Sequence, residues 1–281
     1  MIKDKELKMN KTDKVVLVTG CSSGIGKAIA ELLATAGCTV VATARKLEDL
    51  AGLTVAKKMI LDVCEKKAFE QIVDVIVREL GRIDVVINNA GFAIEGAIEE
   101  LSHAQLQSML DVNLFGVLTS VQSVVPHMRK QKSGQIINIG SIAGRWASPF
   151  GGGYCMTKHA LVALSDSLRQ ELHPFGISVV LIEPGPVKSR FDEKRVKASA
   201  GLIENPDSPY ALYYQRYNEI MVESRKSQAD PEEIAQVVLK AVLNKKSIAR
   251  CLVGVPAIIR VILALSPAKR DTAFARIFVK S

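Results

Sequence analysis

Short runs of apolar residues alternate along this chain with longer segments that have helical periodicity. Each run is continuous, which is typical of strands whose two faces are both covered. Strands that alternate with helices of about ten residues or more indicate βαβ units. The pattern therefore predicts an α/β protein with a doubly wound parallel sheet flanked by helices. The predicted strands are residues 15–18, 39–42, 59–61, 83–87, 135–139 and 177–182, and the predicted helices are 27–36, 65–80, 104–110, 114–131, 154–173 and a last one from Pro231.

The chain is long enough for one α/β domain with a sizeable core. Its 281 residues are 48% apolar and 23% charged, a composition that excludes a disordered or collagen-like chain. No internal repeat or low-complexity linker divides it. We expect one domain over residues 14–249, an N-terminal extension over 1–13 and a basic, apolar C-terminal tail over 250–281.

Cysteine and histidine usage gives no sign of a disulfide framework or a metal site. The five cysteines are an odd number without a C-x-x-C pair, and the four histidines lack metal-ligand spacing, so no metal is predicted. Residues 1–14 are charged and lack the apolar stretch of a signal peptide. These features favour a reducing compartment, and we expect a cytoplasmic protein.

Basic residues are concentrated at the C-terminal end. Residues 240–281 carry nine basic and one acidic side chain, whereas residues 15–239 carry 23 basic and 25 acidic ones. A nucleic-acid-binding protein would carry its basic stripe on the folded body, so no nucleic acid is predicted as a partner. In the tail, Arg260 interrupts an apolar run over 252–266, which is shorter than the roughly 20 residues of a spanning helix. Such a tail suits peripheral membrane contact or a subunit interface, and a packed C-terminal helix is the alternative.

A glycine-rich segment lies between the first predicted strand and the first predicted helix. It runs from Thr19 to Gly26 with the spacing Gly-x-x-x-Gly-x-Gly. Glycines let a pyrophosphate approach the backbone, and the N-terminus of the helix that follows favours an anion. The alternative is a plain tight turn between strand and helix. The residues expected at the phosphates are Gly20, Ser22, Ser23, Gly24, Ile25 and Gly26.

Three motifs in a fixed order carry a family resemblance over residues 14–245. They are the glycine-rich segment, Asn88-Asn89-Ala90-Gly91 after the fourth predicted strand, and Tyr154-x-x-x-Lys158 at the start of a predicted helix. Together they resemble the short-chain dehydrogenase/reductase family. The resemblance implies a single Rossmann-type domain, an oxidoreductase activity, and a homodimer or homotetramer formed through the helices at 114–131 and 154–173.

The end of the second predicted strand bears on the choice of nucleotide. In nicotinamide-binding sheets an acidic residue there binds the adenosine ribose and selects NAD. In this chain Ala44 occupies that position and Arg45 follows it. A guanidinium can clamp a 2′-phosphate that a carboxylate would repel, so we predict NADP(H), with Arg45 and Ser22 at the phosphate. The alternative is that Arg45 is a solvated loop residue.

The resemblance also implies the remaining cofactor contacts. Asp62 and Val63 would lie at the adenine, and Asn89, Ala90 and Gly91 would border the cofactor, although Asn89 could instead hold the central strands together. The segment Pro184-Gly185-Pro186-Val187-Lys188-Ser189 resembles one that meets the nicotinamide carboxamide. Ser189 stands where the family has threonine and keeps the hydroxyl. The residues expected in this segment are Pro184, Gly185, Val187 and Ser189.

The candidate catalytic residues are Tyr154, Lys158, Ser141 and Asn113. A free tyrosine has a pKa of about 10, and a nearby ammonium lowers it. Tyr154 and Lys158 are four residues apart on one helix face, so the lysine can tune the tyrosine. By resemblance Tyr154 is the acid/base, Lys158 also holds the nicotinamide ribose, Ser141 holds the substrate oxygen, and Asn113 positions a proton relay. Taken singly, Ser141 could be a strand-end cap and Asn113 a helix-break residue.

The pattern changes after Pro184, where an insertion over about 187–228 follows a strand end. Four of the five tyrosines fall at 210–217. Open α/β sheets bind ligands outside such strand ends, so the insertion is a candidate substrate region, with a surface helix packed by its tyrosines as the alternative. Arg145 and Trp146 lie between Ser141 and Tyr154, where substrate could pass, and packing is the alternative for Trp146.

These features predict an NADP(H)-dependent carbonyl reductase, or the corresponding alcohol dehydrogenase. The glycine-rich segment and the one after the sixth strand are most similar to the steroid and retinol dehydrogenase-like branch, which implies a lipophilic substrate such as a steroid, retinoid or long-chain ketone. One alternative is a 3-oxoacyl thioester reductase of fatty-acid synthesis. Another is a catalytically silent nucleotide-sensing regulator, in which Tyr154 or Lys158 would typically be lost; both are present.

Overall fold

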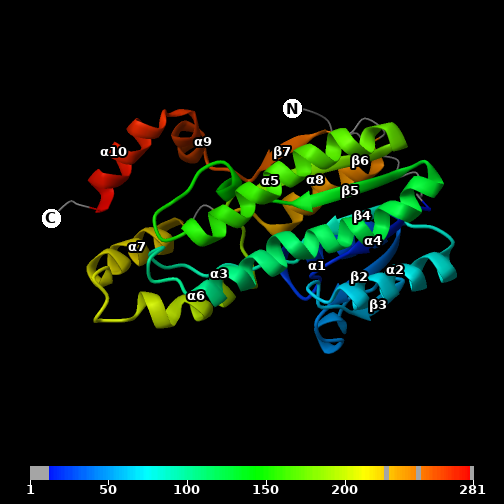
Figure 1. Ribbon diagram of the computed structural model, residues 1–281, viewed down its shortest axis with the longest axis horizontal. Helices are drawn as coiled ribbons and strands as arrows, with labels where there is room; N and C mark the ends of the chain where they lie inside the picture. Colours follow the sequence, from blue (N-terminus) through cyan, green and yellow to red (C-terminus); the bar gives the residue numbers. More distant parts are fainter. Residues whose placement is uncertain (1–12, 225–227, 245–247, 279–281) are drawn as a thin grey trace, which may run out of the picture.

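A single seven-stranded parallel sheet forms the centre of the protein (Figure 1). The computed structural model describes residues 13–224, 228–244 and 248–278. The strand order is β3-β2-β1-β4-β5-β6-β7, which confirms the predicted doubly wound α/β fold. The strands are β1 (Val15–Val18), β2 (Thr39–Ala44), β3 (Lys57–Ile60), β4 (Val85–Asn88), β5 (Gly134–Ile139), β6 (Ile177–Pro184) and β7 (Arg250–Val253).

Helices cover both faces of the sheet. On one face α2, α4 and α5 bury residues such as Phe69, Val124 and Leu161 against the strands. On the other face α1 packs along α8, and both contribute to the second half of the core, for example with Ile29 and Val238. The helices are α1 (Gly24–Thr35), α2 (Lys66–Leu80), α3 (His103–Leu110), α4 (Gly116–Gln131), α5 (Gly152–Leu172), α6 (Arg190–Ile203), α7 (Ala211–Ser224), α8 (Pro231–Leu243), α9 (Ala257–Ala264) and α10 (Pro267–Phe278).

Local sequence explains where several helices begin and end. α8 starts with Pro231 at its first position, and Asp230 and Glu233 form a capping box around its N-terminus. α2 ends at Gly81, whose left-handed φ of 77° suits glycine. α1 begins three residues earlier than the sequence predicted, because the glycine-rich segment itself forms its first turn.

One helical segment in the described part of the chain is long and apolar enough to cross a membrane by length and composition. This segment, His103–Gln131, joins α3, a π-helical turn at Asp111–Phe115 and α4. It packs against α2 and β5, and it buries side chains that include Met109 and Val124. Its apolar content is therefore that of a core helix in the layer over the sheet.

The sheet extends further along the chain than the sequence predicted. Arg250–Val253, which the sequence analysis assigned to the tail, pair in parallel with Leu181–Pro184 as strand β7. The structural tail therefore starts after Val253 and consists of α9 and α10. Of the predicted extension over 1–13, residues 1–12 lie outside the described residues.

The glycine-rich segment after β1 and the segment after β6 both lie at the carboxyl ends of the strands, and we call the place between them the cleft. β1 and β4 are neighbours in the sheet, although β1 is followed in sequence by β2, so the chain diverges there to opposite sides. Ligands of doubly wound sheets bind in the crevice at such a point. α6 follows the end of β6 and lies with α7 at this end of the molecule (Figure 1).

Candidate active site

The glycine-rich segment between β1 and α1 packs closely against neighbouring backbone atoms and the Asn89 side chain. A Cβ atom on Gly26 would lie 2.3 Å from the Gly20 carbonyl oxygen and 2.4 Å from Nδ2 of Asn89. Gly20 itself has a φ of 73°, a conformation that favours glycine. Asn89 Nδ2 donates to the carbonyl oxygens of Thr19 at 3.0 Å and of Gly20 at 3.1 Å. The segment therefore needs its glycines, and Asn89 holds it to the end of β4.

The N-terminus of α1 can receive an anion. Its N-cap residue Ser23 makes no side-chain capping hydrogen bond, and the first turn contains no acidic residue. Across the cleft, a Cβ atom on Gly24 would lie 2.8 Å from Cβ of Ser189, so the segment after β6 closes over the glycine loop. These glycines leave a narrow cradle in front of free N–H groups, and such a cradle fits a pyrophosphate.

A basic side chain stands free at the end of β2, beside the glycine loop. The backbone N–H of Cys21 donates to the Thr43 carbonyl at 2.8 Å, which places Ser22 next to this strand end. Ala44 is buried, whereas Arg45 is exposed and makes no ion pair within the described residues. Its neighbour Lys46 pairs with a glutamate instead. The end of β2 therefore carries a guanidinium, and it has no carboxylate at the position where an acidic residue would select NAD.

Asp62 and Val63 shape the turn after β3. Asp62 Oδ1 accepts a hydrogen bond from the Cys64 backbone N–H at 3.0 Å. Val63 is buried against Gly116, where a Cβ atom would lie 2.8 Å from Val63 Cγ2. The two residues thus stand at the end of β3, where the sequence analysis placed the adenine contacts.

Asn88, the last residue of β4, ties the strands together. Asn88 Nδ2 donates to Asn138 Oδ1 at 2.9 Å, and Asn138 Nδ2 donates to Ser165 Oγ at 2.9 Å. This buried chain joins β4, β5 and α5. Asn89 has the strand-holding role considered for it as well, because its backbone N–H and its side chain donate to Thr19 and Gly20 at the end of β1, as does the Ala90 N–H to Thr19.

The segment after β6 reaches across the cleft from the opposite side. The Gly185 N–H donates to the Val253 carbonyl at 2.8 Å, and Val187 forms a parallel bridge with Ala229. Ser189 caps α6 by accepting from the Phe191 N–H at 3.3 Å. β7, which the sequence did not predict, thereby helps to fix the start of this segment.

Tyr154 and Lys158 lie on α5 and face the cleft together. Lys158 Nζ is 5.7 Å from the centroid of the Tyr154 ring, and it donates to the Ile139 carbonyl at 3.0 Å. Lys158 is buried, and this burial lowers the pKa of its amine to about 8. The ammonium is therefore held close to the tyrosine at a strand end.

The surroundings of the Tyr154 hydroxyl favour its protonated form. Desolvation raises the pKa of Tyr154, and a hydrogen bond with Ser141 opposes that rise only in part. From the sequence we expected the Lys158 ammonium to lower this pKa. In the protein alone desolvation is the larger effect, so the net direction is opposite. A phenol that keeps its proton can donate it to an oxygen placed beside it.

Ser141 combines the two roles considered for it. Its Oγ accepts from the Ala143 N–H at 3.1 Å and so caps the short 3₁₀ turn Ile142–Gly144 after β5. The same side chain hydrogen-bonds Tyr154. The cap thus orients the hydroxyl toward the tyrosine.

Asn113 lies buried in the π-helical turn between α3 and α4. Its Nδ2 donates to the Phe92 carbonyl at 2.9 Å and to Thr157 Oγ1 at 3.1 Å, and its Oδ1 accepts from the Phe92 N–H at 3.0 Å. A Cβ atom on Gly91 would lie 3.0 Å from the same Oδ1. Asn113 therefore connects the loop after β4 to α5 one turn from Tyr154.

A buried ion pair on the substrate side of the cleft gave no sequence signal. Glu95 pairs with Arg195 of α6 and also accepts from the Tyr217 hydroxyl at 2.6 Å. Arg195 reaches Asp192 as well, at 3.3 Å. Burial raises the pKa of Glu95, while Arg195 and the Tyr217 hydrogen bond oppose the rise. Because these partners are about a hundred positions apart, only the folded chain brings them together.

The region after β6 forms the helices α6 and α7, and the alternative of a helix packed by its tyrosines holds for α7, where Tyr214 and Tyr217 are buried. Phe150 lies 4.7 Å from the Tyr214 ring and 5.4 Å from the Tyr217 ring, by centroids. Its φ of 61° is unusual for a bulky residue. The Tyr154 ring lies 5.9 Å from that of Phe191. α6 and α7 thus bring aromatic rings to the wall beside Tyr154.

Arg145 and Trp146 have partners that the sequence could not reveal. Arg145 binds the fully buried Glu183 with hydrogen bonds of 2.6 and 3.0 Å, and Arg250 of β7 binds the same carboxylate at 2.8 Å. Trp146 packs against Phe274 of α10, with ring centroids 5.1 Å apart. Arg145 therefore serves an internal ion cluster, and the packing alternative applies to Trp146.

Within the described ranges, no group of three or more His, Cys, Asp or Glu side chains is arranged to hold a metal ion.

Comparison with known proteins agrees with this geometry. A family model described as short chain dehydrogenase matches residues 14–200. The 3-ketodihydrosphingosine reductase of Bacteroides thetaiotaomicron is 34% identical over 86% of this chain and 88% of its own length. Human 17-beta-hydroxysteroid dehydrogenase type 1 is 34% identical over 83% and 75%, and human retinol dehydrogenase 8 is 36% identical over 82% and 77%.

Solved structures show the same fold with nicotinamide cofactors of both kinds. An alcohol dehydrogenase from Thermococcus sibiricus, complexed with 5-hydroxy-NADP, matches with a TM-score of 0.70 at 27% identity over 87% of this chain and 97% of the other. A Burkholderia phymatum short-chain dehydrogenase/reductase in complex with NAD matches in fold, with a TM-score of 0.77 at 24% identity over 94% and 96%.

Proposed function

Because the chain belongs to the short-chain dehydrogenase family, we propose that it is an NADP(H)-dependent oxidoreductase that reduces a carbonyl to an alcohol, or performs the reverse reaction. The substrate would be lipophilic, such as a steroid, a retinoid or a long-chain ketone. The observation that carries this proposal is the half-buried Tyr154, whose hydroxyl interacts with Ser141 and which has Lys158 one turn away on α5. This arrangement supplies the acid that a carbonyl reduction needs.

The residues divide the chemistry among them. A bound nicotinamide supplies or accepts the hydride at the substrate carbon. Tyr154 donates its proton to the substrate oxygen, and Ser141 hydrogen-bonds that oxygen and stabilises the charge that develops on it. Lys158 holds the nicotinamide ribose and places a positive charge near the phenol. In the reverse direction Tyr154 must first lose its proton, so that it can accept the proton of the substrate alcohol.

Residues on both sides of the cleft would hold the cofactor. We assign its phosphates to the loop before α1, its adenine end to the turn after β3, and its nicotinamide end to the segment after β6. Catalysis is assigned to Tyr154, Lys158, Ser141 and Asn113, the last as a positioning residue. The cofactor-binding set is Gly20, Ser22, Ser23, Gly24, Ile25, Gly26, Arg45, Asp62, Val63, Asn89, Ala90, Gly91, Tyr154, Lys158, Pro184, Gly185, Val187 and Ser189.

Arg45 favours the phosphorylated form of the cofactor. Its exposed guanidinium stands at the end of β2 beside Ser22, and Ala44 replaces the carboxylate that would repel a 2′-phosphate. The Thermococcus enzyme with 5-hydroxy-NADP shows that this fold accepts such a nucleotide. We therefore assign the 2′-phosphate to Arg45 and Ser22.

A lipophilic substrate suits the apolar wall around the tyrosine. Tyr154 packs against a buried cluster that contains Ile94, Leu101 and Met109. Phe191 adds an aromatic ring from α6. Relatives named for a ketodihydrosphingosine, a hydroxysteroid and a retinol act on substrates of this kind.

The decisive experiment is reduction kinetics of the Tyr154→Phe protein beside the parent. The panel would contain ketosteroids, retinal, aliphatic ketones and acetoacetyl thioesters, so that the thioester alternative is tested in the same assay. With the best substrate we expect kcat to fall by a factor of about 10²–10⁴, because the proton donor is lost, while NADPH affinity stays within about twofold of the parent's, measured by fluorescence titration. A variant that reduces the substrate as fast as the parent overturns the proposal.

Exchanging one charge tests the choice of nucleotide. Arg45→Asp should weaken NADPH relative to NADH by about tenfold to a hundredfold, because a charge-assisted contact is replaced by a repulsion. Lys46→Asp is the matched control, since Lys46 is also exposed but pairs with Glu48. An unchanged preference in Arg45→Asp contradicts the NADP(H) assignment.

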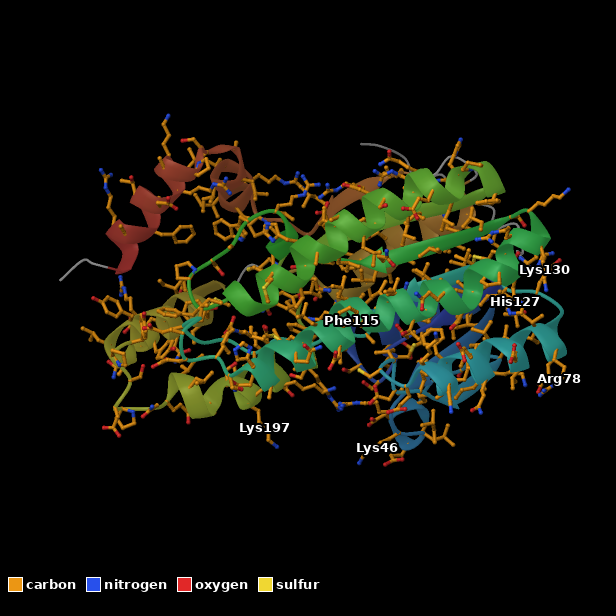
Figure 2. All side chains as sticks on the ribbon, in the orientation of Figure 1. Lys46, Arg78, Phe115, His127, Lys130 and Lys197 are labelled. Atoms are coloured by element: carbon orange, nitrogen blue, oxygen red, sulfur yellow. The ribbon has the colours of Figure 1, made fainter. Side chains whose placement is uncertain are left out.

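We also propose that the protein forms a homodimer or a homotetramer in the cytoplasm. Phe115 is 46% exposed beside the N-terminus of α4, and Figure 2 shows it on the helical layer that faces the viewer. α4 and α5 form this layer and would pair between subunits. Light scattering on the purified protein would give the number of subunits.

A further inference from the structure

Helix α9 presents apolar side chains to solvent. None of its side chains is buried, and Ile258 and Val261 are 66% and 58% exposed. These two residues are three positions apart and therefore share one side of the helix. Ile259 and Ile262 are half-buried on the side that faces the protein. The exposed side is thus an apolar stripe in a part of the chain that follows the catalytic fold.

Positive charge surrounds this stripe. Arg260 is exposed on α9, and Lys269 and Arg276 are exposed on α10. Asp271 is the only acidic residue between positions 248 and 278. The body of the protein is nearly neutral, with 23 basic and 25 acidic side chains over residues 15–239, so a second copy offers little charge complementary to the tail. An anionic lipid surface offers both a negative charge and an apolar boundary.

The tail also touches the loop of the active site. Phe274 of α10 packs on Trp146, which lies between Ser141 and Tyr154. α10 also contacts α7, the second helix of the substrate region. Figure 1 shows α9 and α10 standing away from the sheet at the end of the molecule that carries α6 and α7. A surface bound by the tail would therefore lie close to the region where substrate enters.

We propose that α9 and α10 dock this protein on the surface of an anionic bilayer. Ile258 and Val261 enter the boundary between headgroups and acyl chains, and Arg260, Lys269 and Arg276 bind anionic headgroups. The docked protein then presents the α6–α7 side of its cleft to the membrane, from which a lipophilic substrate would enter. This last consequence rests on the proposed function, whereas the docking itself does not.

The test is flotation of the full-length protein with vesicles. Vesicles of phosphatidylcholine alone are compared with vesicles that also contain phosphatidylserine, at low and at physiological ionic strength. We expect binding that needs phosphatidylserine and weakens with salt. Ile258→Glu with Val261→Glu should reduce the partition coefficient by about tenfold or more. Lys269→Gln with Arg276→Gln should reduce it by about 25-fold, at about fivefold for each charge removed near the surface.

Matched controls separate docking from folding and from assembly. Ile60→Glu changes an equally exposed apolar residue, 60% exposed, on β3 at the far edge of the sheet, and should leave flotation unchanged. Lys27→Gln with Lys46→Gln is the control for the charge substitutions, because it removes two positive charges from surfaces outside the tail. Reduction of a water-soluble ketone shows that the tail variants are folded, and because flotation needs no turnover, loss of activity alone does not count against docking.

Three outcomes overturn the proposal. The parent does not float with either vesicle, or it floats equally well after the tail substitutions. In the third, Ile258→Glu with Val261→Glu changes the number of subunits in light scattering without a change in flotation, which would make the stripe a subunit interface.

Discussion

The two sides of the cleft are held together in different ways. On the cofactor side, formed by residues 19–26 and the ends of β1, β2 and β4, the close contacts at Gly20 and Gly26 are mainly with backbone atoms, and the side-chain amide of Asn89 also takes part in them. On the substrate side, formed by residues 92–101 with α6 and α7, they are between side chains and distant segments. The Tyr214 hydroxyl there accepts from the Ala97 N–H at 2.7 Å and donates to Glu100 at 2.5 Å.

This difference matches what each side has to bind. A backbone cradle keeps its shape when side chains change, which suits a cofactor that is the same for many enzymes. A wall made of side chains can be altered one residue at a time, which suits a substrate that differs between relatives. The four predictions below test this division, from the largest expected effect to the smallest.

The first prediction concerns the buried pair of the substrate side. Glu95→Gln leaves Arg195 without its main counter-charge, and we expect the free energy of unfolding to fall by about 3–4 kcal/mol. Glu219→Gln, which removes a partner from the exposed Arg216–Glu219 pair of α7, should change it by less than about 0.5 kcal/mol. Urea unfolding measures both. If the two variants lose the same free energy of unfolding, the buried pair does not hold the substrate side together.

The second prediction concerns the backbone contacts of the cofactor side. Gly26→Ala puts a Cβ atom against the Gly20 carbonyl, and we expect a loss of about 2–3 kcal/mol in stability together with weaker NADPH binding. Gly201→Ala is the matched change on the substrate side. Its Cβ atom meets nothing within 4 Å in α6, so it should stabilise the protein by about 0.5–1 kcal/mol. If the Gly26→Ala protein binds NADPH as tightly as the parent in a titration, the close fit at this glycine is contradicted.

The third prediction concerns Lys158, which stands where the two sides meet. Burial lowers its pKa to about 8 from an ordinary value of 10.5, so the unfolded chain holds this proton over a pH range where the folded chain has lost it. Stability due to this group therefore increases as the pH rises. Relative to Lys158→Met, the parent should gain about 2 kcal/mol between pH 7 and pH 10. A difference that stays constant over this range, in unfolding at each pH, would show that the amine is not desolvated.

The fourth prediction asks whether the tail belongs to the substrate side. Trp146→Ala and Phe274→Ala, alone and combined, should give a coupling energy of about 1 kcal/mol, as expected for an aromatic pair. Thermal unfolding of the four proteins measures it. Additive effects would mean that α10 is energetically independent of the active-site loop.

The sequence predicted the cofactor side because its signals are local. The glycine spacing and the strand before it identify the loop without reference to its distant partner Asn89, and the structure has that loop between β1 and α1. Glu95 and Arg195 carry no such signal, because their pairing depends on how α6 folds back over residues 92–101. The direction of the Tyr154 pKa was wrong for the same reason: desolvation comes from the tertiary surroundings, and the ammonium on the same helix was the only visible influence.

β7 was missed because it is short and starts with a charge. Its four residues begin with Arg250, whose guanidinium is needed inside the fold to bind Glu183. A charged residue beside a basic segment is ordinarily a sign of an exposed tail. The remaining apolar residues of the strand then merge with those of α9 in the sequence.

The shared carboxylate of Glu183 has a practical consequence for anyone who shortens this protein. Ending the chain before Arg250 would remove a strand and leave Glu183 with Arg145 alone. Such a deletion would disturb the turn that carries Ser141 while seeming to trim only a dispensable end. A fusion partner or an affinity tag is better joined after α10, because this helix still packs on the active-site loop through Phe274 and Trp146.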